Sequence, residues 1–110
     1  MAYDEQLADR LRGVLGDGPD ISERKMFGGL VFLHGGNMMC GVTGDALMLR
    51  LGADRADAAL GEPHTRPMDF TGRPMKGIVL VDPAGLTTDE ALERWIERAR
   101  DFVLTLPPKR

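Results

Sequence analysis

The sequence predicts an α+β fold, a two-layer sandwich in which an antiparallel sheet carries helices on one face. Three observations support this prediction. Amphipathic helical patterns lie at both ends of the chain, short apolar runs separated by glycine turns lie between them, and no linker or repeat interrupts the pattern. A chain of 110 residues can bury one core without disulfides. We therefore expect one domain over residues 1–110, with the order α-β-β-β-α-β-β-α.

Composition excludes several classes of protein. The formal net charge of −3 argues against a surface that attracts phosphate backbones as a whole. The first residues lack the basic start and apolar centre of a secretory signal, and no run approaches the roughly 18 apolar residues of a membrane span. The single cysteine, Cys40, cannot form an internal disulfide. We expect a cytoplasmic protein.

The first element is a helix over residues 3–15. Its apolar residues fall on one helical face, and Asp4 and Glu5 lie where a helix start favours negative charge. The sequence GDGPD, residues 16–20, ends it.

Three short strands are predicted between residues 24 and 51, with tight turns at HGGN, residues 34–37, and TGDA, residues 43–46. Gly28 and Gly29 precede the apolar run LVFL and indicate a bend, a bulge or a close approach of another backbone. A phosphate-binding loop is disfavoured, because neither G-x-G-x-x-G nor a Lys-Ser/Thr after the glycines is present.

Strand alternation predicts which residues share a face of this sheet. Met38, Cys40 and Val42 are expected on one face, and Met39 and Met48 on the other. The final strand also carries apolar residues on both faces, so the sheet needs a second cover. A homodimer is the simplest cover, and the alternative is that a helix or the proline-rich segment folds across the second face.

The second half of the chain predicts two helices and two strands. A short helix over residues 54–60 is expected to be capped by Asp54. Residues 63–77 contain three prolines and a short strand at residues 68–71, and the prolines place this segment near an edge. A clear strand follows at residues 77–82. In the last helix Thr87 and Glu90 form a predicted capping box, followed by an apolar stripe from Leu92 to Leu106.

No catalytic, cofactor or metal site is predicted, and we do not expect an enzyme. The two histidines, His34 and His64, show no zinc-type spacing with Cys40 or with Asp45 and Asp69. Cys40 is expected to point into the core, which leaves it without the exposed, electropositive setting of a nucleophile.

One basic segment has functional interest. In PHTRPMDFTGRPMKG the candidate partner or anion contacts Arg66, Arg73 and Lys76 alternate with methionine and phenylalanine. The alternative is an ordered crossover loop whose basic groups are solvated and whose apolar residues complete the core.

The sequences KMFGGLVFL, GNMMCGV and PMDFTGRPMKG, in this order before an apolar strand and a long helix, resemble the TfoX (Sxy) N-terminal domain family of bacteria. The resemblance covers nearly the whole chain. The matching positions are assigned to fold or interface: Met26, Phe27, Gly28, Gly29, Asn37, Met38, Gly72, Pro74, Lys76 and Gly77.

The resemblance implies a fold similar to that of secretion chaperones, often a dimer, and no established catalytic residues. Its namesakes regulate competence genes alongside a cyclic-AMP-responsive transcription activator, and they carry a second, helical domain associated with nucleic-acid contact. This chain ends at Arg110, so we expect a stand-alone, single-domain member. The expected function is a noncatalytic protein-interaction module with a transcription-related protein partner. The alternatives are direct nucleic-acid binding through Arg66 to Lys76, or small-ligand binding.

Overall fold

The computed structural model describes residues 3–16, 18–26, 28–70 and 73–107. Three α-helices, six strands and a short 3₁₀ turn follow one another along the chain. The bounds are α1 Glu5–Leu15, β1 Ile21–Met26, β2 Gly29–His34, β3 Asn37–Thr43, β4 Ala46–Arg50, α2 Ala53–Ala59, β5 Thr65–Phe70, β6 Arg73–Val81, η1 Pro83–Gly85 and α3 Asp89–Val103.

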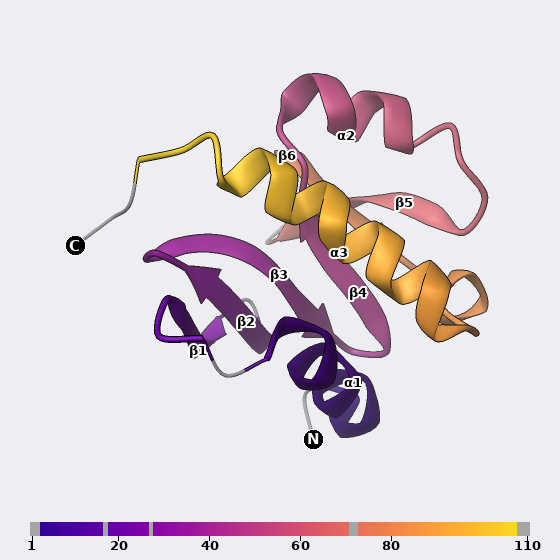
Figure 1. Ribbon diagram of the computed structural model, residues 1–110. Helices are drawn as coiled ribbons and strands as arrows, with labels where there is room; N and C mark the ends of the chain where they lie inside the picture. Colours follow the sequence, from indigo (N-terminus) through magenta and orange to yellow (C-terminus); the bar gives the residue numbers. More distant parts are fainter. Residues whose placement is uncertain (1–2, 17, 27, 71–72, 108–110) are drawn as a thin grey trace.

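The strands form one antiparallel sheet in the order β1-β2-β3-β4-β6-β5. All three helices lie on the same side of it, with α3 running across the middle strands (Figure 1). Their apolar residues and the facing residues of the strands make one core cluster, in which Leu11, Leu47 and Ile96 are fully buried. The predicted α+β fold with helices on one face is confirmed.

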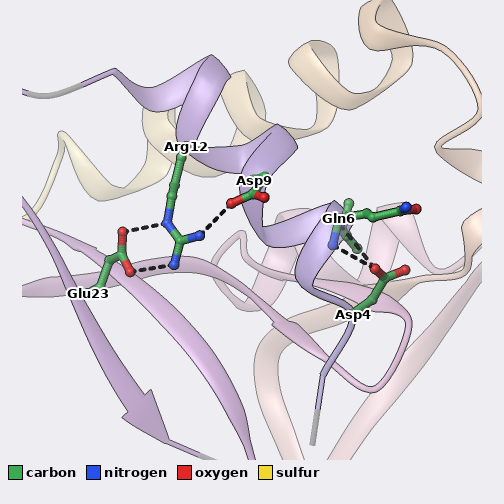
Figure 2. Close-up of polar contacts among 6 residues, drawn as sticks. Asp4, Gln6, Asp9, Arg12 and Glu23 are labelled. Carbon is green, nitrogen blue, oxygen red and sulfur yellow. Dashed lines mark hydrogen bonds and ion pairs between the residues drawn. The ribbon is translucent and has the colours of Figure 1, made fainter. Parts of the chain in front are cut away.

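Helix α1 is fixed at its start and along its exposed side by polar contacts (Figure 2). The Asp4 carboxylate accepts hydrogen bonds from the N–H groups of Gln6 and Leu7, at 2.9 and 3.3 Å, so it caps the helix. Farther along, the Arg12 guanidinium donates to both oxygens of Glu23 on β1, at 2.8 and 2.9 Å, and to Asp9 at 2.7 Å. This contact ties the first helix to the first strand.

The first group of strands has one strand more than we expected. The residues ISERKM, of which the middle four are polar, form β1, which pairs with β2 from Ile21 opposite His34 to Met26 opposite Gly29. Gly28 and Gly29 therefore lie at the turn of a hairpin, and not at a bend within one strand. Strand β1 escaped prediction because its middle residues are exposed and polar, so it has no apolar alternation.

A β-bulge changes the faces predicted for β3. The register between β2 and β3 shifts between Phe32 and Leu33. As a result Met39 joins Cys40 in the core beneath the helices, whereas Met38 lies on the opposite face. The predicted faces of these two methionines were thus wrong, because a bulge inserts one residue and interrupts the period of two.

Both later helix caps also differ from prediction. Helix α2 begins after Gly52, with no side-chain cap, and Asp54 lies within its first turn. Helix α3 is capped by Thr88, whose hydroxyl accepts from the N–H of Ala91 at 3.1 Å, so the start lies one residue beyond the predicted box of Thr87 and Glu90. The apolar stripe of α3 is confirmed: Leu92, Trp95, Ile96, Ala99 and Val103 are buried.

Candidate functional site

The face of the sheet without helices carries a second apolar cluster, here called the methionine face. Its buried residues are Val31, Leu33, Ala46, Met48, Met68, Ile78 and Leu80, and the half-buried Met26, Met38 and Met75 pack against them. Five of the seven methionines of the chain belong to this face. Methionine side chains are flexible and polarisable, and they are frequent on surfaces that bind varied partners.

The proline-rich segment contributes side chains to this face. Residues 63–77, expected to be irregular, contain β5 and the start of β6, which form a hairpin at the sheet edge. The hairpin supplies Met68, which is 3% exposed, and Met75. The hairpin therefore adds side chains to this face from the edge of the sheet, and the homodimer stays a prediction.

The three candidate basic contacts do not form one cluster along this hairpin. Arg66 of β5 lies opposite Leu80, and Arg73 of β6 lies opposite Phe70 at the turn. The two arginines are therefore at opposite ends of the hairpin. The Arg66 guanidinium donates to the Asp82 carboxylate at 2.8 Å, which offsets its charge. Lys76 is exposed, and Arg73 and Pro74 are placed by their backbone alone.

Several positions of the resembling motif have a structural role. Asn37 begins β3 and is 4% exposed, and its side-chain amide donates to the Pro107 carbonyl at 2.9 Å. This bond holds the chain after α3 against the β2–β3 turn. A Cβ atom on Gly29 would collide with the carbonyl oxygen of Val42, so this glycine permits the close approach of β3.

Gly77 of β6 is hydrogen-bonded to the two residues that connect β4 to α2. Its φ of 85° lies in the left-handed region that favours glycine, and its carbonyl accepts from the N–H groups of Leu51 and Gly52, at 2.8 and 3.2 Å. Met26 and Met38 belong to the methionine face. Phe27 and Gly72 lie outside the described residues.

The cysteine and the two histidines lie apart from one another in the part of the chain that the structure describes. Burial raises the pKa of the Cys40 thiol to about 12, as expected for a thiol in the core. His34 ends β2, while His64 precedes β5 at the other side of the sheet. Across the described ranges no three His, Cys, Asp or Glu side chains gather to hold a metal ion.

One hollow contains the side chain of a candidate histidine. This hollow of about 230 Å³ beside the β2–β3 turn is lined by Asp20, His34, Gly35, Asn37, Val103, Leu104 and Leu106. It places a histidine and a carboxylate beside apolar groups, but its lining offers no hydroxyl or thiol nucleophile.

Comparison with known proteins identifies the fold family. The family model of the TfoX N-terminal domain matches residues 13–103, which include the last turn of α1 and every later element from β1 to α3. The chain belongs to the TfoX N-terminal domain family. Membership indicates a domain like those of competence and transcription regulators. No curated protein and no solved structure matches the chain.

The sequence interpretation of this TfoX N-terminal domain did not predict that Met26 and Met38 share the methionine face. Met26 was assigned only through the family motif, and Met38 was expected on the face of Cys40. Their common face is explained by the bulge in β3 and by the extra strand β1. The repeated methionines were a signal for this face, because the five that belong to it lie in five different strands of the sheet.

Among the described helices none is long and apolar enough to cross a membrane.

Proposed function

We propose that this TfoX N-terminal domain is a noncatalytic, cytoplasmic protein-interaction module that works as a homodimer in transcription regulation. The observation that carries the proposal is the methionine face, where Met26, Met38 and Met75 remain half-buried at the surface of an otherwise closed cluster. Family membership supports the regulatory class. The dispersed His, Cys and acidic side chains of the described residues offer no comparable basis for catalysis.

The chemistry of the face selects one kind of partner, a protein segment that combines apolar side chains with carboxylates. Arg24 lies opposite Val31 of the face, and it is exposed. Apolar side chains of the partner would pack among the methionines, while its carboxylates would meet Arg24 at the rim.

The experiment is an affinity pull-down from native cytosol with three tagged proteins, treated with nuclease and analysed by quantitative mass spectrometry. The test variant combines Met26→Lys and Met75→Lys, because a lysine stem can lie where each methionine lay while its ammonium repels an apolar partner. The matched control is Leu104→Lys, which makes the same kind of change at an apolar residue 59% exposed after α3.

The proposal expects at least one protein that is retained by the wild type and the Leu104 variant, and lost from the methionine variant. Equal retention by all three proteins would contradict docking on the methionine face. Retention that disappears with nuclease would favour the alternative of nucleic-acid binding, and would contradict the protein-interaction function.

A further inference from the structure

The sheet has one open edge among the described strands. Strand β1 ends the sheet, and its register with β2 is continuous from Ile21 to Met26. Just before it, the Gly35 N–H donates to the Asp20 carbonyl at 2.9 Å, which makes these two residues a hydrogen-bonded pair. Because such pairs alternate along an antiparallel ladder, the peptide groups of Ile21, Glu23 and Lys25 point away from β2. They can receive another strand.

The opposite edge is blocked. At β5 the Asp82 N–H donates to the His64 carbonyl at 2.8 Å, and by the same alternation Thr65 and Pro67 direct their peptide groups outward. Proline has no N–H, so the edge lacks a donor at that point. In the described part of the sheet, β1 is therefore the edge suited to pairing between chains.

The charges of β1 select the occupant of this edge. We propose that β1 pairs antiparallel with β1 of a second copy of the chain, centred on Arg24. In that register each Glu23, whose carboxylate already accepts from Arg12 of its own chain, lies directly opposite the Lys25 of the other copy. The peptide groups of both residues point away from β2. Opposite charges at directly facing positions stabilise a strand pair. Centring on Glu23 or Lys25 would instead place two like charges in a hydrogen-bonded pair.

This register has one unfavourable contact, because the two Arg24 side chains face each other. Each Arg24 lies on the methionine face, because it is paired with Val31 of that face. Both side chains are exposed to solvent, where they can diverge and where salt screens their repulsion. The inference rests on the homodimer of the proposed function and names its surface. An axis perpendicular to the sheet would place both methionine faces on one side of a continuous sheet.

The test is sedimentation equilibrium of wild type and three variants, each checked for native circular dichroism. Lys25→Pro removes an outward N–H and spares the ladder with β2, and we expect it to abolish the dimer. Glu23→Lys gives an edge with two cations, and Lys25→Glu gives an edge with two anions. We expect each of these alone to weaken the dimer Kd about tenfold or more. Mixed in equal amounts, they should restore a dimer of one chain of each kind.

Each other outcome overturns the proposal at a distinct point. A monomeric wild type at 100 times the concentration used in the cytosolic pull-down would overturn the homodimer, while leaving docking on the methionine face to its own test. A dimer that survives Lys25→Pro would place the interface elsewhere. Loss with Lys25→Pro but no restoration in the mixture would contradict the register centred on Arg24. Pairing of β1 with a different protein, seen by crosslinking at Lys25, would overturn the choice of a second copy.

Discussion

At the scale of single residues, Asn37 shows how a buried polar group can hold the segment that follows a helix. It is the buried polar residue of the described chain, and its amide reaches the Pro107 carbonyl across 70 positions of sequence. A buried amide is retained at little cost only when it is hydrogen-bonded. The bond therefore accounts for the position of Asn37 in the GNMMCGV motif without a ligand.

Substituting Asn37 should loosen the segment after α3. We expect Asn37→Ala to lower the free energy of unfolding by about 1–2 kcal/mol, measured by urea denaturation, because the hydrogen bond and part of the packing are lost. Asn37→Asp keeps the size but cannot donate when ionised, so its loss should be larger at pH 7. Wild-type stability in Asn37→Asp would show that the contact with Pro107 contributes nothing.

The ion pair between Arg12 and Glu23 should give a small pH dependence. Hydrogen bonds from Arg12 lower the pKa of the Glu23 carboxyl below its ordinary 4.5, against the opposing effect of burial. The pair therefore stabilises the fold above pH 4.5, and this contribution is lost as the pH falls through the lowered pKa. Because the side chains of Arg12 and Glu23 are 42% and 39% exposed, we expect the pair to contribute about 0.5 kcal/mol to the free energy of unfolding.

The measurement is the pH profile of urea unfolding between about pH 3 and 7, compared with Glu23→Gln. The variant should be less stable by that amount at pH 7 and should converge with wild type at the acid end. A constant difference across the range would assign the effect to packing rather than to the charge.

At the scale of elements, the glycines decide how closely strands approach. We expect Gly29→Ala to destabilise the fold by about 3 kcal/mol, because its Cβ would meet the Val42 carbonyl and force β2 and β3 apart. Gly13→Ala is the matched control, since Gly13 lies in α1 with nothing within 4 Å of an added Cβ. It should stabilise by about 0.5–1 kcal/mol. Thermal unfolding measures both, and similar shifts in the two would contradict the close approach.

The sequence contained enough information to predict the elements with apolar periodicity. Three predicted features are present in the structure: the apolar stripe of α3, the turns at Gly35–Gly36 and Gly44, and the placement of Leu47 and Met48 on opposite faces. Their apolar contrast is strong, so local pattern and tertiary packing agree.

Features set by pairing between strands could not be predicted. Strand β1 is exposed and polar, and it is a strand because β2 offers it a partner. The bulge beside Met39 depends on the register of β2 against β3, which one strand's sequence does not contain. The basic segment looked like a single patch in sequence, but the hairpin of β5 and β6 separates Arg66 from Arg73 and brings Asp82 to Arg66.

At the scale of the whole molecule, the two faces of the sheet differ in kind. Three helices seal one face with leucine, isoleucine and tryptophan, whereas methionines from β1, β3, β4, β5 and β6 complete the other. The first face has fixed packing against its own helices. The second ends in side chains that can repack against a partner, and this contrast underlies the proposed interaction function.

Methionine oxidation by dilute peroxide, read by mass spectrometry with and without the captured partner, tests this claim most directly. In the free protein Met26, Met38 and Met75 should oxidise, whereas Met39 in the opposite core, 0% exposed, should resist and serves as the internal control. The account predicts that the partner protects these three methionines and leaves Met39 unchanged. Unaltered oxidation of all three in the complex would show that the partner binds elsewhere, and would contradict the methionine face as the docking surface.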